Sequence, residues 1–128
     1  MEYINVTLAG SYFCIKVYRT GGKFGEAMKT CESERAKLLV ITTQAQIAEL
    51  VNKTADNVTV WAYIGISDAA NEGNWVSWDG KAVFPSWYPG EPSNSNQQNC
   101  AFFGYLNKQV IDMSCNELQP FICHKIYF

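Results

Sequence analysis

The chain has 128 residues, of which 48% are hydrophobic and 14% aromatic, and this composition predicts one globular domain, 1–128, with a single core. Its formal net charge of −2 comes from 10 basic and 12 acidic residues without long runs of either sign, which argues against binding to nucleic acid or to an anionic membrane. No apolar run approaches the roughly 20 residues of a membrane span, and the first ten residues lack the basic start and apolar centre of a signal peptide, so we expect a soluble, already mature chain.

Five cysteines are many for a cytosolic chain of this length. Cys100, Cys115 and Cys123 cluster near the end at spacings unlike those of paired zinc-binding motifs, so disulfides are the better interpretation. Because five is an odd number, one thiol stays free or pairs between two chains. Three N-glycosylation sequons favour the same secretory context: Asn5–Thr7, Asn52–Thr54 and Asn57–Thr59. We therefore expect a secreted or extracellular glycoprotein with disulfide bonds.

Residues 11–18 predict a strand, because β-branched and aromatic side chains alternate along them. The alternation places Phe13, Ile15 and Val17 on one face and Cys14 on the opposite face. The thiol of Cys14 is then either accessible, and able to join two chains, or buried as a small hydrophobe.

Two helices are predicted after this strand. Residues 22–38 have apolar side chains at helical spacing, and Cys31 falls on the buried side of the helix. A second helix should begin at Thr43, whose hydroxyl can cap the first turn while Gln46 reaches back in a capping box. Its apolar stripe is core rather than a cofactor site: Ile47, Leu50 and Val51. From residue 67 to residue 119, turn formers interrupt short apolar pieces, so we expect strands and long loops.

Catalytic motifs are missing from the sequence. The single histidine, His124, follows Cys123, and no GxSxG, HExxH or P-loop pattern occurs. Asp68 and Glu72 form a carboxylate pair, but their segment is typical of a solvated turn. The sequence therefore predicts a protein that is not an enzyme.

A set of short segments recurs in one order along nearly the whole chain: Cys31, residues 62–68 (AYIGISD), 71–80 (NEGNWVSWDG), 87–93 (WYPGEPS), 99–100 (NC), 111–115 (IDMSC) and 121–123 (FIC). In these motifs and their spacings the chain closely resembles the C-type lectin-like domain. The resemblance implies an α+β fold with two helices, antiparallel sheets, a lower sheet that joins the two ends of the chain, and a long loop region that holds the binding site.

The same resemblance implies two intrachain disulfides, Cys31–Cys123 and Cys100–Cys115, and leaves Cys14 over. In longer members of the family the Cys14 position pairs with an N-terminal cysteine, and this chain has Tyr3 about where that partner would stand. A homodimer joined through Cys14 is one expectation and a buried free thiol is the other.

A calcium site is implied at the family's Glu-Pro-Asn motif, where this chain has Glu91, Pro92 and Ser93. In the family the proline is cis, and the side chains on both sides of it bind one calcium ion, which also takes two adjacent sugar hydroxyls. The resemblance implies Glu91, Ser93 and Asp112 as metal and sugar ligands, with Gln98 as a weaker metal ligand.

This chain departs from the family pattern at several ligands. Gln98 stands where an acid is expected, and Ile111 stands where an amide is expected beside Asp112. Fewer charged ligands predict one weak site, with a dissociation constant of about 10⁻⁴–10⁻³ M or higher, or no site at all. A second, auxiliary position lies near Asp68 and Glu72, and there we expect no strong ion, because neutral residues replace the family's acids: Asn94, Gln98 and Asn99.

The preference for one type of sugar depends on which ligand residues donate hydrogen bonds to the sugar hydroxyls and which accept them. Ser93 replaces the amide that favours mannose-type sugars. Its hydroxyl can either donate a hydrogen bond to a sugar hydroxyl or accept one from it. Tyr105 is predicted to stack on the apolar face of a galactose-type sugar, the alternative being an ordinary exposed aromatic residue. Three tryptophans are predicted to be structural: Trp75, Trp78 and Trp87.

The sequence thus predicts a calcium-dependent lectin that slightly favours galactose-type over mannose-type sugars and whose partner is a glycan or a glycoprotein. The alternative is a calcium-independent C-type lectin-like domain that binds a protein or another surface through the same loops. Loss of the amide at Ile111 favours the alternative, whereas the presence of Glu91 and Asp112 favours the lectin.

Overall fold

The computed structural model describes residues 3–56, 59–71, 73–92 and 98–125. Within these ranges two helices and eight strands follow one another in the order β1 (Ile4–Leu8), β2 (Ser11–Gly22), α1 (Phe24–Ser33), β3 (Ala36–Leu38), α2 (Gln44–Thr54), β4 (Trp61–Ser67), β5 (Val76–Ser77), β6 (Cys100–Gly104), β7 (Val110–Met113) and β8 (Gln119–Lys125). Neither helix in the described part of the chain is long and apolar enough to cross a membrane.

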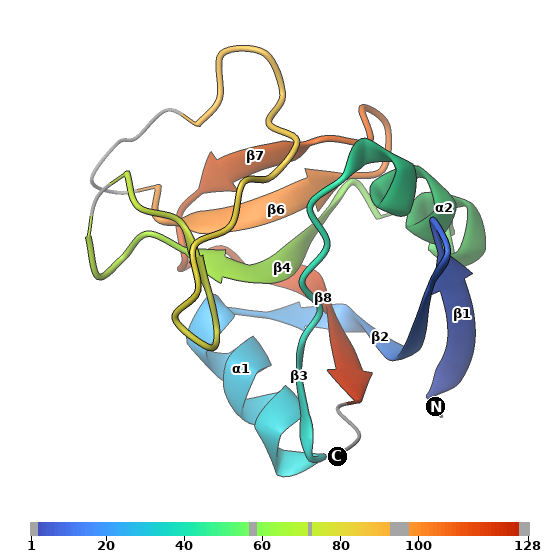
Figure 1. Ribbon diagram of the computed structural model, residues 1–128. Helices are drawn as coiled ribbons and strands as arrows, with labels where there is room; N and C mark the ends of the chain where they lie inside the picture. Colours follow the sequence, from blue (N-terminus) through green and yellow to red (C-terminus); the bar gives the residue numbers. More distant parts are fainter. Residues whose placement is uncertain (1–2, 57–58, 72, 93–97, 126–128) are drawn as a thin grey trace.

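The strands form one sheet in the order β1-β2-β8-β4-β6-β7, with β3 added to β8 and β5 added to β4. β2 lies between β1 and β8 and pairs with both, so both ends of the described chain lie at the same end of the molecule (Figure 1). This is the expected lower sheet. The described strand pairs are antiparallel except for β4 with β8, which are parallel where Tyr63 faces Phe121. The sheet is therefore mixed rather than purely antiparallel.

Helix α1 begins where the Glu26 side chain accepts a hydrogen bond from the Lys23 N–H at 2.9 Å. Ala27 and Cys31, one turn apart, are fully buried, as the helical spacing predicts. The helix ends at Ser33, and residues 36–38, at the end of the predicted helical stretch, instead form β3 against β8. Pairing with β8 therefore determines the conformation of these residues, although their apolar side chains have helical spacing.

Helix α2 has the cap that the sequence predicts. The Thr43 hydroxyl accepts a hydrogen bond from the Gln46 N–H at 3.2 Å. The Gln46 side chain also reaches back, but it accepts from the N–H of Thr42, at 3.3 Å, rather than from that of Thr43. Ile47 and Leu50 are fully buried, so the apolar stripe of the helix faces the core.

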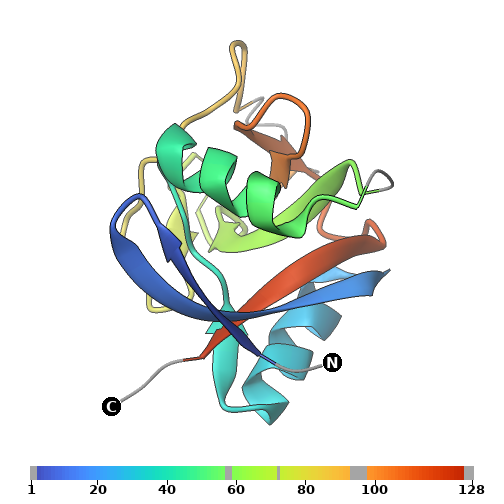
Figure 2. The same ribbon diagram turned by 90° about the vertical axis from the view of Figure 1, so that its right-hand side faces the viewer.

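Apolar clusters lie on both faces of the sheet. Ile64, Phe103 and Ile122 belong to the cluster under α2. Because side chains alternate along a strand, the residues next to them in sequence belong to the cluster under α1. These neighbours are Tyr63, Phe102, Phe121 and Cys123. The central strands are therefore covered on both sides, and Figure 2 shows α1 and α2 at separate positions around them.

Two disulfides connect distant segments, and both expected pairings are confirmed. Cys31 of α1 is bonded to Cys123 of β8, and Cys100 of β6 is bonded to Cys115 after β7. Cys14 is a free thiol and is buried, with 7% of its surface exposed. Its position in β2 is covered although it lies on the face opposite Ile15.

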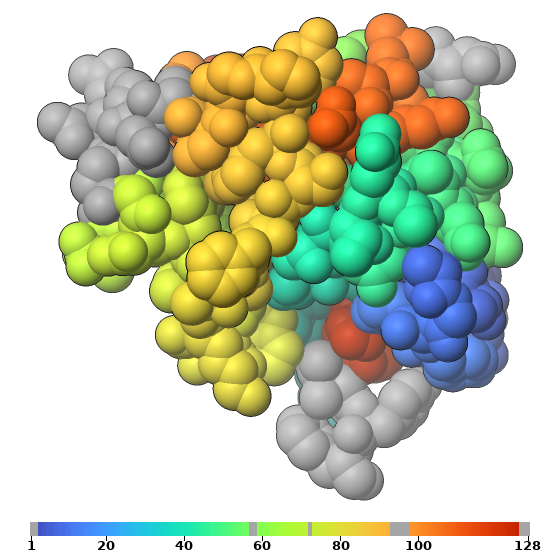
Figure 3. Space-filling model, turned by 45° about the horizontal axis from the view of Figure 1, so that its top comes forward, coloured from blue at the N-terminus to red at the C-terminus, as the bar shows by residue number. Residues whose placement is uncertain are grey.

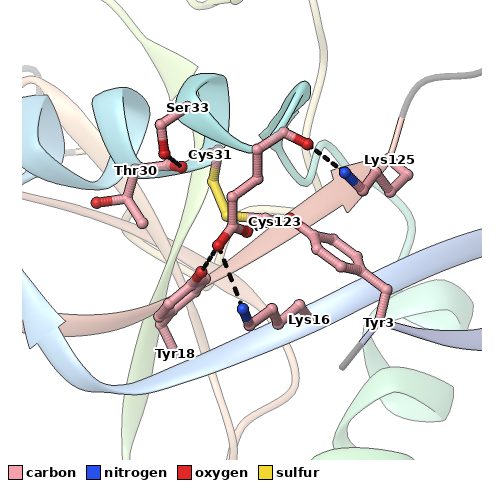
Figure 4. The surroundings of a disulfide bond; sticks show 9 residues. Tyr3, Lys16, Tyr18, Thr30, Cys31, Ser33, Cys123 and Lys125 are labelled. Atoms are coloured by element: carbon pink, nitrogen blue, oxygen red, sulfur yellow. Dashed lines mark hydrogen bonds and ion pairs between the residues drawn. A yellow bond between two sulfur atoms is a disulfide. The ribbon is translucent and has the colours of Figure 1, made fainter. Parts of the chain in front are cut away.

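A hydrogen-bonded cluster surrounds the end of α1 near Cys31 (Figure 4). The Glu34 carboxylate accepts hydrogen bonds from the Tyr3 hydroxyl at 2.7 Å, from Lys16 Nζ at 3.2 Å and from the Tyr18 hydroxyl. These bonds, that from Tyr18 first, lower the pKa of Glu34 to about 2. Tyr3 therefore links the residues before β1 to Glu34, the residue that follows α1, by a hydrogen bond.

Candidate functional site

The segment before the Glu-Pro-Ser motif is bonded to the start of β7. Val110 donates its N–H to the Ser86 carbonyl at 2.9 Å and accepts from the Tyr88 N–H at 2.8 Å. A turn follows, in which the Glu91 N–H donates to the Tyr88 carbonyl at 2.8 Å. Asp112 lies two residues beyond Val110 on β7. This pairing places Glu91 and Asp112 in adjoining segments at the same edge of the molecule.

The predicted metal ligands lie as follows. Glu91 is half-buried, and its peptide bond to Pro92 is cis, as the family pattern implies. Asp112 is 2% exposed on β7, and Gln98 is half-buried just before β6. Ser93 lies outside the described residues. The structure thus describes two carboxylates and one amide of the predicted set.

These side chains provide oxygen donors, which are the ligands that calcium prefers, but few charges. In the described part of the chain no group of three or more histidine, cysteine, aspartate or glutamate residues is arranged to hold a metal ion. Ile111 is half-buried, and its side chain packs against the apolar cluster under α1. The residues present fit a hard cation of weak affinity rather than a tightly held one.

Asp68 occupies the auxiliary position and joins the loop after β4 to the segment before β6. Its backbone N–H donates to the Asn99 carbonyl at 3.1 Å, and its Oδ2 accepts from the Gly73 N–H at 2.9 Å. The side chain is 1% exposed, and Oδ1 is buried with no hydrogen-bond partner among the described residues. An orphaned carboxylate oxygen is suited to a cation, but Gln98, the residue before Asn99, is neutral, and Glu72 and Asn94 lie outside the described ranges.

Tyr105 is buried, so the prediction that its ring is exposed and stacks on a sugar is wrong. The residue is 7% exposed, and its ring packs against Phe103 at a centroid distance of 5.2 Å. Its hydroxyl lies 2.7 Å from the Thr54 hydroxyl, at the end of α2. Alternation predicts one covered face for this strand, whereas α2 and α1 cover both, so Phe102 and Phe103 are both fully buried.

The three tryptophans differ in their surroundings. Trp75 is 6% exposed and meets the half-buried Trp87 edge to face, with ring centroids 4.8 Å apart, so both are structural as predicted. Trp78 is 40% exposed instead, and Lys37 Nζ lies 5.4 Å from its ring centroid. A short hairpin explains the difference, because Val76 pairs with Ala82 and Trp78 falls in its turn.

Sequence reasoning missed Phe84, which is 88% exposed and shares a groove with Pro92. The groove has a volume of about 410 Å³. Its described lining residues fall between residues 73 and 92. The segment 75–92, coloured yellow to gold in Figure 3, covers much of the face shown there. An isolated phenylalanine among turn-forming residues is the one signal in the sequence that points to it.

Comparisons with known proteins agree on one family. Residues 20–125 match the family described as the lectin C-type domain. CD209 antigen-like protein D of Mus musculus is 32% identical over 100 residues, which cover 75% of this chain and 40% of that protein. A perlucin-like protein of Mytilus galloprovincialis is 29% identical over 111 residues, which cover 80% of this chain and 70% of that protein.

Solved structures share the fold over nearly the full chain. The mouse scavenger receptor C-type lectin carbohydrate-recognition domain has a TM-score of 0.83 and 26% identity, covering 99% of this chain and 95% of that one. A calcium-independent type II antifreeze protein has a TM-score of 0.79 and 21% identity, covering 98% of both chains, a likeness of fold alone. With its motifs, its two disulfides and a family match over residues 20–125, the chain belongs to the C-type lectin domain family.

Proposed function

We propose that this domain binds carbohydrate through one weakly held calcium ion, with Glu91, Ser93, Gln98 and Asp112 as side-chain ligands. The observation that supports this most is the pairing of residues 86–88 with Val110, which places Glu91 and Asp112 in adjoining segments. Bound calcium would supply a coordination shell that two adjacent sugar hydroxyls complete. The carboxylates of Glu91 and Asp112 accept hydrogen bonds from the same hydroxyls.

A slight preference for galactose-type over mannose-type sugars is part of the proposal. It rests on Ser93, because a hydroxyl both donates and accepts, whereas the amide of a Glu-Pro-Asn motif donates to the hydroxyl that mannose presents. Tyr105 adds nothing to this preference, since its ring is buried. The discrimination between the two sugars should therefore be small.

A second candidate function is calcium-independent binding of a protein or another surface by the same loops. Ile111 favours it, because the side chain at this ligand position packs against the apolar cluster under α1 and supplies no oxygen. In this case Glu91 in its loop and Asp112 on β7 bind no metal ion, and chelators leave binding unchanged.

We place the domain in a secreted or extracellular, non-enzymatic context, with a glycan or glycoprotein as partner. His124 lies in β8 with Phe13 against its ring, at a centroid distance of 5.0 Å, and burial lowers its pKa.

Of the three glycosylation sequons, Asn5 is exposed on β1 with Thr7 beside it, which suits a modified asparagine. Asn52 is exposed on α2, but the hydroxyl of Thr54 in that sequon donates to the Leu50 carbonyl.

Calcium titration of metal-free protein tests the proposal. A ligand that binds only the folded chain stabilises it by RT ln(1 + [L]/Kd), so 10 mM calcium at a Kd of about 1 mM adds about 1.4 kcal/mol and raises the melting temperature by several degrees. The protein should be retained on immobilised galactose in calcium and eluted by EDTA.

Glu91→Gln should abolish both the melting shift and the retention. Glu117→Gln is the matched control, because Glu117 is exposed in the turn before β8. Retention on mannose alone overturns the sugar preference. Binding that is unaffected by EDTA, without a melting shift, replaces this proposal by the calcium-independent one.

A further inference from the structure

A groove among the described residues includes Pro92, the residue that follows Glu91, in its lining. The lining also includes four further residues: Trp75, Trp87, Phe84 and Pro85. Its volume of about 410 Å³ falls in the usual range for small-molecule sites, about 300–1,000 Å³. Because Pro92 follows Glu91 directly, a sugar held at Glu91 would have this groove as its neighbour.

The walls of the groove are held by the fold. Val83 donates its N–H to the Trp75 carbonyl at 3.0 Å, and Val76 pairs with Ala82, so the two sides of the short hairpin, which supply these four lining residues, are bonded to each other. Trp75 and Trp87, which also line the groove, pack edge to face. Both tryptophans also contact the main apolar cluster, so the groove is formed without a ligand.

The chemistry of the lining selects its occupant. None of the described lining residues is charged, and Asn74 is the one among them with an amide side chain. Phe84, which is 88% exposed, presents its ring to solvent. Aromatic rings stack with flat apolar groups, and a second sugar ring would need more polar partners than one amide provides.

We propose that this groove binds a flat, uncharged, apolar aglycone of the sugar held at Glu91, and that Phe84 is the residue that stacks on it. The inference rests on the proposed carbohydrate function and adds the class of ligand: galactosides with an aromatic aglycone. Stacking of this kind should tighten binding about three- to tenfold over the methyl glycoside.

Isothermal titration calorimetry in calcium with methyl β-galactoside, 2-naphthyl β-galactoside and the disaccharide lactose tests it. The naphthyl glycoside should bind about three- to tenfold more tightly than the methyl glycoside. Phe84→Ala should remove most of this gain and leave the affinity for the methyl glycoside unchanged. Leu106→Ala is the matched control, since Leu106 is 87% exposed and lies outside the groove.

The outcomes separate the two proposals. Equal affinity for the methyl and naphthyl glycosides, or a gain for lactose alone, overturns the aglycone site while leaving the lectin function intact. A naphthyl gain that Phe84→Ala does not change overturns the role of Phe84 and the groove. If none of the three galactosides binds, the aglycone site fails, and retention on immobilised mannose then separates a wrong sugar preference from a failed lectin function.

Discussion

The hydroxyl groups of Thr54 and Tyr105 lie 2.7 Å apart in the core and join the last turn of α2 to the end of β6. Thr54 also donates to the Leu50 carbonyl at 2.8 Å, which leaves its oxygen free to accept from Tyr105. Tyr105 is thus bonded to the helix rather than directed at a ligand. The pKa of its hydroxyl is raised, chiefly because the group is buried.

Tyr105→Phe should lower the free energy of unfolding by about 1 kcal/mol, because it removes one buried hydrogen bond and keeps the packed ring. Urea denaturation measures this loss. Sugar binding by the variant should equal that of the wild type. A variant with unchanged stability but lost sugar binding would show that Tyr105 contacts the ligand after all.

Glu34 should make stability depend on pH in the acid range. Its pKa is about 2 in the folded chain against an ordinary value of 4.5, chiefly because Tyr18 donates to the carboxylate. Since the folded pKa is the lower one, this stabilisation is complete above pH 4.5 and is lost as the pH falls toward 2. Melting temperatures measured from pH 6 to pH 2 should show the loss.

Glu34→Gln should flatten that part of the profile, and Tyr18→Phe should flatten it in part, because Tyr3 and Lys16 still donate to Glu34. An unaltered acid slope in Glu34→Gln would assign the pH dependence to other carboxylates.

The thiol of Cys14 should react slowly in the folded protein, because the residue is 7% exposed in β2. A thiol reagent added to native protein should label it only after denaturant is present, and non-reducing electrophoresis should show a monomer. Rapid labelling without denaturant, or a dimer band that reduction removes, would instead support a covalent homodimer through Cys14.

Removing the two disulfides should cost different amounts. Cys31 and Cys123 are 92 residues apart and Cys100 and Cys115 are 15 apart. A chain-entropy model assigns about 4–5 kcal/mol to the longer loop and about 3 kcal/mol to the shorter one. Chemical denaturation of the two double Cys→Ala variants compares them. A larger cost for Cys100 and Cys115 would mean that native contacts in the loop region outweigh loop entropy.

Local patterns in the sequence determined much of this protein. The strand at residues 11–18, the cap at Thr43 and the buried face at Cys31 follow from spacing and side-chain chemistry within a few residues, and the structure confirms each. The family motifs added the fold and both disulfide pairings, since they record contacts between distant segments. The calcium ligands Glu91, Ser93, Gln98 and Asp112 stay a prediction from the same motifs.

Only the tertiary structure decided which faces are covered. Alternation along β6 cannot show that α2 docks over Tyr105, because Thr54 lies 51 residues away. Nor can it show that Cys14 is enclosed, that Trp78 falls in an exposed turn, or that Phe84 shares a groove with Pro92. Hydrophobic periodicity and secondary-structure propensity reflect residues that are close in the chain, whereas burial depends on which distant element packs on each face.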